Sequence, residues 1–259
     1  ADNGDLNEVP AYCILARWQA IEREEAIVNG EIAPDLMSAV VWVARPIGVG
    51  ETTDFDTYRP GADLLIATPA VAADGSISLG PPTSLLAGCG LTQATADVRR
   101  PQASWDATRI AFAARSAADQ PLRLYWMDSD GGACGLIPGV APSTPMENGI
   151  LTHDFDPAFS PNGEIVFAST RGNLDRAAYT YQGPTRTPAA MEPNANLFVF
   201  TQFGETTVRQ LTHLLNQELQ PSFTAEGRVV YTVQKRQPGF HQIALRRMNL
   251  DGGDFRPFF

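Results

Sequence analysis

The sequence predicts an all-β fold built from repeated four-stranded antiparallel sheets, and three observations predict it. The 22 Gly and 20 Pro residues in a chain of 259 favour many turns and short strands over long helices. The segment 157–167, "PAFSPNGEIVF", returns at 221–231 as "PSFTAEGRVVY" with the same length. Asp-Gly pairs follow several of the apolar runs, and this pair is a strong hairpin signal because Gly tolerates the positive φ of tight turns.

Two further segments extend the repeat to about four copies. Residues 101–112, "PQASWDATRIAF", fit the same template with one extra residue in the turn and with Ala107 where the other copies have Gly. The run "VVWVAR" at 40–45 matches "IAFAAR" at 110–115, although the residues before it lack the turn. Each copy continues into a second apolar run and a Gly-containing turn, so one repeat corresponds to about four short strands.

A single sheet of this kind would expose both faces and an edge strand, so it is stable mainly when it stacks on copies of itself. Radial stacking of such sheets gives a β-propeller. The repeats divide the chain into four predicted blades, which span approximately 36–96, 97–152, 153–215 and 216–259.

The residues before the blades, 1–35, form a predicted N-terminal extension. Within it, Pro10 suits the first turn of a helix, and Leu15, Trp18 and Ile21 fall near helical spacing. A short packing helix is therefore expected, and a strand that begins at Tyr12 is the alternative.

The amino-acid sequence of the repeats resembles that of a known family. "DPAFSPNGEIVF" and "WDATRIAFAAR…LRLYWMDSDGG" resemble the TolB-like (WD40-like) β-propeller repeat, and "VRQLTH" at 208–213 matches the end of that pattern. The resemblance covers about residues 36–259 and implies a bacterial extracytoplasmic protein. Six to eight blades usually close a ring of this type, so four blades imply part of a larger polypeptide. The alternatives are that a partner or the N-terminal segment completes the ring, or that four blades close tightly.

A second resemblance concerns the scaffold only. "GEIVFASTR", "GRVVYTVQKRQPGF" and "RRMNLDGGDFRPFF" are similar to the propeller part of hydrazine synthase alpha-subunit-like bacterial proteins. That family carries haem, but this sequence has no CxxCH motif. The haem chemistry is therefore not carried over, and no cofactor is expected.

Composition excludes two classes of partner. The formal net charge of −10 argues against a nucleic-acid surface, which needs locally dominant Lys and Arg. The longest apolar runs, at 38–44 and 64–73, are far shorter than the ~20 residues of a membrane span. The three cysteines, Cys13, Cys89 and Cys134, lack metal or haem spacing, which leaves one disulfide or free buried thiols open.

The search for catalytic motifs returns none of the usual patterns. The sequence has no GxSxG nucleophile elbow and no HExxH zinc pair. The three histidines stand in different local motifs, and a structural role is expected for each of His153, His213 and His241. Asp54 and Asp56 are weak candidate cation ligands, because two carboxylates without further oxygen donors make an incomplete calcium site.

The residue before each repeated Pro is expected at the mouth of a central channel, with the innermost strand of each blade following the Pro. These residues are Arg100, Asp156 and Gln220. Because they differ in charge, they predict no repeated ligand shell, and one solvated residue per blade is the simpler interpretation.

Repeats one and three carry long insertions between their second and third strands, at 45–62 and 171–195. Loops of this length are usually functional or disordered, and these carry the Tyr and Arg residues favoured at interfaces. The predicted partner surface consists of Phe55, Tyr58, Arg59, Arg176, Tyr179, Tyr181 and Arg186. The alternative is that both loops simply pack over neighbouring blades.

The function expected from these observations is a non-catalytic β-propeller scaffold or protein-interaction domain of a bacterial extracytoplasmic protein or complex. Its partner is expected to be a protein or further chain segments of the same complex, and the chain on its own is not expected to be an enzyme. The alternative is the propeller of a larger enzyme, either a haem oxidoreductase of the hydrazine-synthase type or a propeller-gated peptidase. Propellers host many functions, so the fold alone names none.

Overall fold

The structure is a computed structural model that describes residues 38–47, 55, 57–71, 76–147, 149–172, 194–201, 207–213, 217–237 and 240–258. The predicted extension 1–35 therefore lies outside the described residues, and so do Cys13, Asp54, Asp56, Arg176, Tyr179, Tyr181 and Arg186. The chain divides into two compact units, residues 1–40 with 68–80 and residues 41–67 with 81–259. The described part of the first unit holds a hairpin of β3 (Pro69–Val71) and β4 (Ile77–Leu79).

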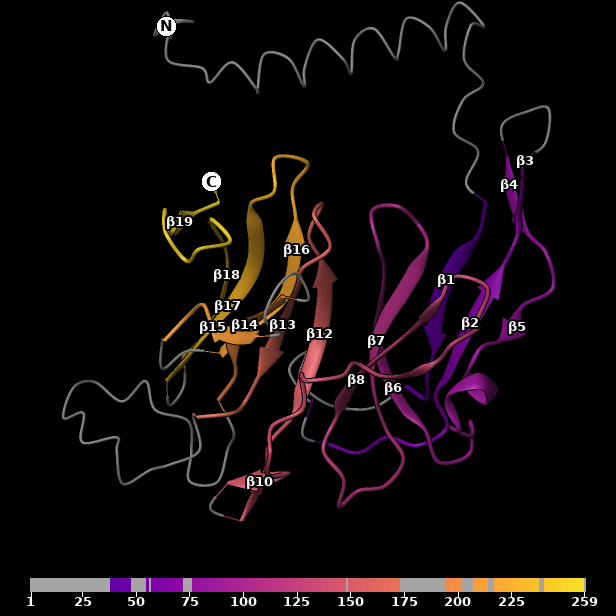
Figure 1. The fold of residues 1–259 in the computed structure, drawn as a ribbon, viewed down its shortest axis with the longest axis horizontal. Helices are drawn as coiled ribbons and strands as arrows, with labels where there is room; N and C mark the ends of the chain where they lie inside the picture. The colour runs from indigo at the N-terminus through magenta and orange to yellow at the C-terminus, as the bar shows by residue number, and fades with distance from the viewer. Residues whose placement is uncertain are drawn as a thin grey trace, which may run out of the picture. The chain divides into compact units, whose positions relative to one another are not determined.

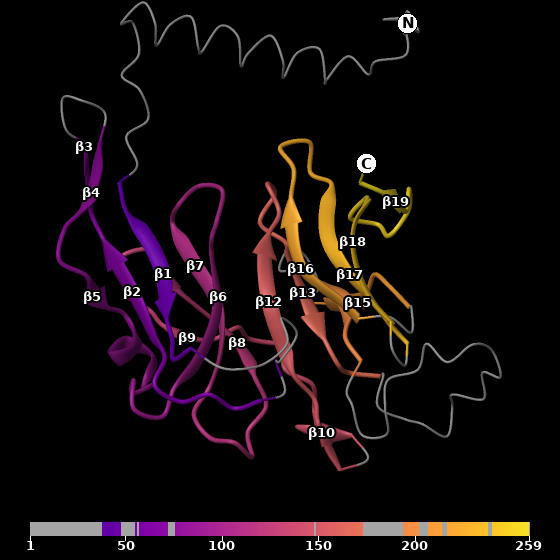
Figure 2. The same ribbon diagram turned by 180° about the vertical axis from the view of Figure 1, so that it is seen from behind.

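The described residues of the second unit form three four-stranded antiparallel sheets, each with its strands in sequence order. Blade 2 consists of β6 (Asp97–Ala103), β7 (Arg109–Arg115), β8 (Arg123–Asp128) and β9 (Gly135–Leu136). Blade 3 consists of β12 (Asp154–Phe159), β13 (Ile165–Ser169), β14 (Asn196–Thr201) and β15 (Thr207–Gln210). Blade 4 consists of β16 (Gln217–Phe223), β17 (Val229–Gln237), β18 (Phe240–Met248) and β19 (Arg256–Pro257). Figures 1 and 2 show these sheets following one another along the chain.

Blade 1 has three strands in the described part of the chain, β1 (Val40–Ala44), β2 (Asp63–Ala67) and β5 (Thr83–Ser84). A short 3-10 helix, η2 (Leu86–Cys89), follows it. The sequence match of 40–45 with 110–115 equates β1 with β7, the second strand of blade 2. The described part of blade 1 therefore begins at its second strand. A small hairpin of β10 (Met146–Glu147) and β11 (Ile150–Leu151) joins blades 2 and 3.

The first strand of each complete blade is broken by a β-bulge at the repeated Pro. The pairing shifts between Arg99 and Gln102 in β6, and at the corresponding places in β12 and β16. The residue before Pro has a positive φ in all three strands, 48° at Arg100, 51° at Asp156 and 56° at Gln220. Proline has no N–H for the ladder and is accommodated at a bulge. The sequence-based expectation that the strand follows the Pro is corrected, because each strand begins three or more residues before it.

The core forms between successive blades. One cluster of buried side chains joins blades 2, 3 and 4, and a second joins blades 1 and 2. All five residues of β13 are buried, because this strand is covered on both faces of its sheet. An all-β architecture of four-stranded antiparallel blades is thus confirmed for repeats two to four.

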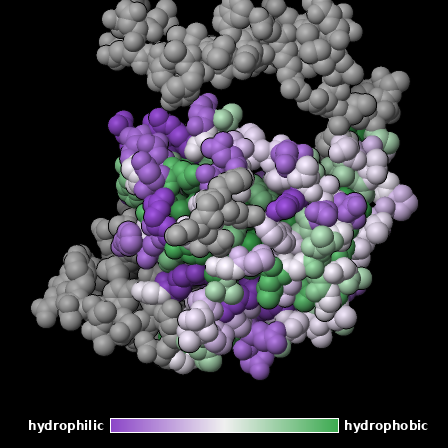
Figure 3. All heavy atoms as spheres, in the orientation of Figure 1, coloured by the Kyte–Doolittle hydropathy of each residue, from purple (hydrophilic) through white to green (hydrophobic). Residues whose placement is uncertain are grey.

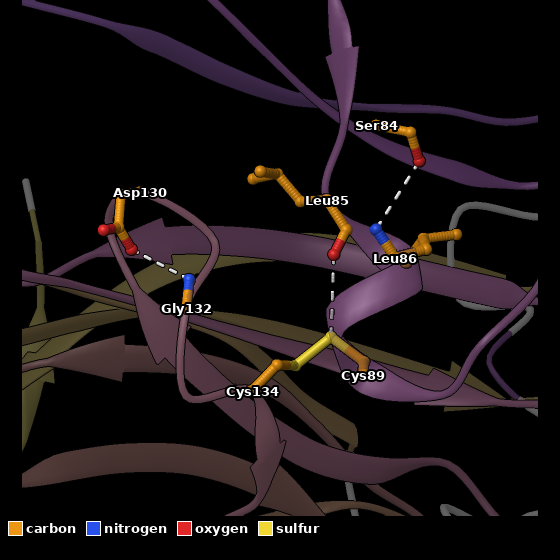
Figure 4. The surroundings of a disulfide bond; sticks show 7 residues. All are labelled: Ser84, Leu85, Leu86, Cys89, Asp130, Gly132 and Cys134. Carbon is orange, nitrogen blue, oxygen red and sulfur yellow. Dashed lines mark hydrogen bonds between the residues drawn. A yellow bond between two sulfur atoms is a disulfide. The ribbon is translucent and has the colours of Figure 1, made fainter.

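A disulfide between Cys89 and Cys134 fastens blade 1 to blade 2 and settles the alternatives left open for two of the three cysteines. It joins η2 to the segment between β8 and β9, and the two Cα atoms are 4.8 Å apart. Figure 4 shows the turn beside it, where the Asp130 carboxylate accepts a hydrogen bond from the Gly132 N–H at 2.8 Å. The backbones approach closely here, since a Cβ on Gly88 would lie 2.9 Å from the Gly131 carbonyl oxygen.

Candidate functional site

The three residues predicted at a channel mouth lie within strands and are joined in a row across blades 2, 3 and 4. Arg100 Nε lies 3.5 Å from Asp156 Oδ1, and the Gln220 N–H donates to Asp156 Oδ2 at 3.0 Å. Asp156 is only 8% exposed, and its burial raises the pKa of the carboxyl against the opposing effect of Arg100. The row therefore links three inner strands to one another. Its position at a channel mouth stays a prediction.

The loop after β1 is anchored on blade 2 through a buried carboxylate. Asp97 is fully buried and its Oδ2 lies 3.0 Å from an Nη of Arg115, while Arg45 donates to its Oδ1 at 3.2 Å. The backbone N–H of Arg59 also donates to Asp97 Oδ2, at 3.3 Å. The Tyr58 hydroxyl lies 2.6 Å from the Thr95 carbonyl oxygen, and it donates there. Tyr58 and Arg59 are half-buried and bound to their own chain.

Phe55 corrects part of the predicted partner surface. It is 3% exposed and belongs to the core shared by blades 2, 3 and 4. Its ring stacks on Phe155 with centroids 4.4 Å apart and meets His153 edge-on at 5.8 Å. The first long loop thus packs over neighbouring blades at this residue, which was the alternative to a partner surface.

The three polar side chains of the "HDFD" segment, at residues 153–156, bind different partners and do not form a common site. His153 Nδ1 accepts a hydrogen bond from the Leu122 N–H at 3.1 Å, and burial with nearby arginines lowers the pKa of His153 to about 3. Asp154 is fully buried and bound by Arg123 (3.1 Å) and Arg171. Because Asp156 binds a different set of partners, no three-ligand site forms.

The described residues contain no group of three or more His, Cys, Asp or Glu side chains that could hold a metal ion. His213 is exposed, and the His241 side chain lies outside the described residues. The weak cation candidates Asp54 and Asp56 are likewise outside them.

Glu218 in β16 differs from the other buried acids. It is fully buried, and neither carboxylate oxygen has a hydrogen-bond partner in the described structure. Burial raises the pKa of Glu218 to about 7, opposed by Thr212 and the Arg246 charge. The Thr212 hydroxyl, however, donates to Asn196 at 3.2 Å. The Tyr231 hydroxyl is also buried without a partner among the described atoms, and burial, then the Glu218 charge, raises its pKa.

Each blade carries three corresponding apolar residues on the face that the next blade covers, which we call the trailing face. The first two of these residues lie in the third strand of the blade or directly before it. The backbone N–H of the last residue donates a hydrogen bond to the carbonyl oxygen of the second residue, as from Leu211 to Leu197 at 2.8 Å. The first three sets are Ala62, Leu64 and Leu85 in blade 1, Leu122, Leu124 and Ile137 in blade 2, and Ala195, Leu197 and Leu211 in blade 3. All nine of these residues are buried.

The corresponding residues of blade 4, which we call the docking residues, are Ile243, Leu245 and Phe258. The Phe258 N–H donates to the Leu245 carbonyl at 3.2 Å, which identifies them as the counterparts of Leu211 and Leu197. They are 58%, 39% and 38% exposed. Figure 3 shows that hydrophobic surface reaches the solvent in several places on one face of the molecule. The trailing face of blade 4 is therefore built like a covered face but is open.

A separate cleft of about 400 Å³ lies between the β6–β7 and β12–β13 turns. Trp105 lines it with half of its surface exposed, and its indole N–H donates to the Phe159 carbonyl at 2.9 Å. Sequence reasoning missed this residue. The available signal was an aromatic side chain at a turn position that Pro161 and Ala225 occupy in the other repeats.

Comparisons with known proteins place the fold. No protein-family model and no curated protein matches the sequence. Among solved structures, hydrazine synthase from Kuenenia stuttgartiensis is similar with a TM-score of 0.56 and 14% identity, over 90% of this chain and 33% of that one. TolB from Agrobacterium tumefaciens gives a TM-score of 0.45 and 17% identity, over 75% of this chain and 61% of that one. TolB from Acinetobacter baumannii gives a TM-score of 0.38 and 15% identity, over 89% of this chain and 55% of that one.

This chain spans less than two thirds of the length of each of these three structures. In the described part of the chain, no helix is both long and apolar enough to cross a membrane. The successive four-stranded blades and the similarity to the hydrazine synthase structure show that the chain has a propeller-type fold.

Proposed function

We propose that this chain is a non-catalytic β-propeller scaffold, an interaction domain whose protein partner docks on the trailing face of blade 4. The observation that carries the proposal is the exposure of Ile243, Leu245 and Phe258, whose counterparts in the other blades are buried. Burying a large apolar side chain contributes about 1.5–3 kcal/mol. Three such residues on one face, at positions that receive a neighbouring sheet elsewhere in the chain, favour a further protein surface as their cover.

The buried charges support a structural rather than a catalytic role. Asp97, Asp154 and Asp156 are each bound by arginines or backbone N–H groups that lie on other strands or neighbouring blades. Catalytic groups need open access to a substrate, whereas these carboxylates hold blades together. Glu218 has a perturbed pKa but is fully buried.

We further propose that the protein works in an extracytoplasmic compartment of a bacterium. The Cys89–Cys134 disulfide supports this location, because disulfides persist in oxidising compartments and are rare in the cytosol. The likeness of the sequence repeats to the TolB type points the same way. Arg176, Tyr179, Tyr181 and Arg186 remain proposed contacts of a partner on the second long loop.

A second candidate is the propeller domain of a larger enzyme. The similarity to hydrazine synthase, of which this chain would span 33%, favours it. Under this alternative, the docking residues would face another part of the same enzyme. Visible-light absorption by the protein isolated from its native source would distinguish a haem enzyme from a scaffold without a chromophore.

Affinity isolation of the tagged protein from its native host tests the proposed scaffold. The double substitution Ile243→Asp and Leu245→Asp places two charges on the docking residues, and we expect it to remove the co-isolated protein partner. Leu136→Asp is the matched control, because Leu136 is 51% exposed and lies on β9 at the outer edge of blade 2. A partner that stays bound to the double variant, identified by mass spectrometry, would contradict docking on blade 4.

A further inference from the structure

We propose that the cleft between the β6–β7 and β12–β13 turns binds an uncharged sugar unit of a glycan, with the ring face of Trp105 as its platform. This inference goes beyond the proposed function, because the cleft lies between blades 2 and 3 and contains none of the docking residues. Three observations carry it: an exposed aromatic side chain that its turn does not require, polar side chains with hydrogen-bonding capacity to spare, and a lining without net charge.

The first observation is that the turn forms equally well without a tryptophan. The Ala107 N–H donates to the Ser104 carbonyl at 2.9 Å, and the corresponding bond, at 3.0 Å, closes the turns of blades 3 and 4. In those two turns Pro161 and Ala225 stand in place of Trp105. Trp105 is nevertheless 51% exposed. A half-exposed tryptophan offers a large, rigid contact surface at a low cost in conformational entropy, which is typical of binding residues.

The indole ring of Trp105 is already held in place for a ligand. Its N–H donates to the Phe159 carbonyl of blade 3 at 2.9 Å, and Figures 1 and 2 show the two turns at the same end of their sheets. A ring fixed in this way loses little freedom when a ligand binds. The face of an aromatic ring is electron-rich, whereas the C–H groups of a pyranose carry partial positive charge, so a sugar ring is attracted to this face.

The second observation concerns the polar groups of the cleft, first of all Asp106. Its carboxylate accepts hydrogen bonds from the hydroxyl groups of Ser104 (2.6 Å) and Thr108 (2.9 Å) and from the Thr108 N–H (3.1 Å), all of them at Oδ1. These bonds, led by the one from Ser104, lower the pKa of Asp106, so the group is ionised at neutral pH. Oδ2 takes no part in them. An ionised carboxylate oxygen is a strong acceptor for a sugar hydroxyl.

Two hydrogen-bond donors accompany this acceptor. The exposed side-chain amide of Asn162 makes no hydrogen bond to another described residue. The Arg109 guanidinium lies 4.4 Å from the centroid of the Trp126 ring, and it likewise donates no hydrogen bond within the described part of the chain. A sugar hydroxyl is both donor and acceptor, so a carboxylate, an amide and a guanidinium together can bind several hydroxyl groups of one ring.

The third observation is the charge and size of the cleft. Asp106 is the one acid and Arg109 the one base among the residues that line it. A lining without net charge disfavours an anion, and a cation would meet Arg109 and a single exposed aromatic face in place of an aromatic cage. The volume of about 400 Å³ lies within the range of small-ligand sites, roughly 300–1,000 Å³. The cleft therefore fits an uncharged, hydroxyl-rich ligand best.

Saturation-transfer difference NMR tests the proposal on the purified full chain, with cellobiose, maltose, lactose and N,N′-diacetylchitobiose as sugar probes and tetramethylammonium as a cationic probe. We expect saturation transfer to the ring C–H protons of at least one sugar and none to tetramethylammonium. Trp105→Ala should weaken sugar binding at least about tenfold. Leu136→Ala is the matched control and should leave binding unchanged, because Leu136 is equally exposed (51%) in the same blade but lies on β9, outside the cleft.

Two further variants separate binding from stability. Asn162→Ala should weaken sugar binding about threefold or more without changing the urea midpoint, since the amide is exposed and makes no hydrogen bond to a described residue. Trp105→Phe loses the bond to the Phe159 carbonyl but keeps a ring face, so it should bind sugar more tightly than Trp105→Ala. Circular dichroism would verify that each variant folds.

Three results would overturn the proposal. They are the absence of saturation transfer to all four sugars, sugar binding that both Trp105→Ala and Asn162→Ala leave unchanged, and binding of tetramethylammonium in place of the sugars. The proposed scaffold is tested on Ile243 and Leu245, which lie on another blade, so its outcome is independent of these results.

Discussion

Blades 3 and 4 are built from closely similar repeats, yet their surroundings differ. In blade 3 the acid of the first strand, Asp154, is bound by Arg123 and Arg171, and the trailing residues are buried. In blade 4 the corresponding acid, Glu218, has no hydrogen bond from any described residue, and the trailing residues are exposed. The comparison teaches that the repeat specifies the sheet, whereas the neighbouring blade determines what each position of the repeat contributes to stability.

The largest expected effect lies in blade 3. Asp154→Ala leaves the Arg123 and Arg171 guanidinium groups without their shared carboxylate, and removal of one partner of a buried ion pair costs about 3–5 kcal/mol. Urea denaturation of wild type and variant measures the difference in the free energy of unfolding. Asp119→Asn, at an exposed residue, serves as the control. A loss below about 1 kcal/mol would mean that Asp154 is not a structural link between these strands.

The next prediction uses one leucine from each blade. Leu197→Ala should reduce the free energy of unfolding by about 2–5 kcal/mol, because it removes a fully buried side chain and leaves a cavity. Leu245→Ala at the corresponding exposed position should change it by no more than about 0.5 kcal/mol in the single chain. Urea denaturation of the wild type and of both variants compares them. Equal losses would show that the trailing face of blade 4 is covered within one chain.

The third prediction concerns pH and blade 4. Because the pKa of Glu218 is raised from 4.5 to about 7, the folded state holds a proton that the unfolded state releases between these pH values. Stability from this group is therefore present below pH 4.5 and is lost as the pH rises through about 7, by about 3 kcal/mol. Glu218→Gln cannot titrate, so the difference between wild type and variant should change by this amount between pH 4 and pH 8.

The titration of His153 changes the stability in the opposite direction, and it overlaps with that of Glu218 in this pH range. The pKa of His153 is lowered from 6.5 to about 3, so its contribution is lost as the pH falls from 6.5. Subtracting the Glu218→Gln curve from that of the wild type removes this shared background. If the two curves run parallel across the range, Glu218 has an ordinary pKa and the contrast with Asp154 disappears.

The smallest expected effect is at the turn after the first strand. Ala107 has a φ of 56° where blades 3 and 4 have Gly163 (93°) and Gly227 (77°). A non-Gly residue in this conformation costs about 1–2 kcal/mol, so Ala107→Gly should raise the free energy of unfolding by up to about 1 kcal/mol. Gly227→Ala is the matched reverse test, since its added Cβ meets no atom within 4 Å and only the backbone conformation is strained. A gain in stability from Gly227→Ala would refute this explanation.

The architecture could be predicted because its signals are local. A turn with Gly or Asp-Gly between apolar runs determines a hairpin wherever it stands in the chain, and the copies at 157–167 and 221–231 each fold as predicted into paired strands. The pairing of Cys89 with Cys134 could not be predicted, because it depends on which ends of two blades meet. Even the repeated Pro misplaced the start of the inner strands, since a bulge carries the strand past it.

The candidate site was predicted less well for the same reason. Phe55 looked like a partner contact because an aromatic residue in a long loop has the same sequence signature whether it packs inward or faces solvent. Leu197 and Leu245 likewise occupy identical places in the repeat, yet blade 4 covers Leu197, whereas Leu245 is exposed in the described structure. Exposure at the end of a row of repeats is a property of the neighbours, which a single repeat does not encode.

The disulfide between blades 1 and 2 also affects which blade is expected to unfold first. In a linear array of repeats, each blade is stabilised chiefly by its neighbours, so loss of order starts at an end. The covalent link at Cys89 and Cys134, which stabilises by about 4 kcal/mol for a loop of this length, holds blades 1 and 2 together. Blade 4 has one covered face and no such link, so hydrogen exchange should be fastest there. Blades 1 and 2 would then stay folded while blade 4 unfolds and refolds locally.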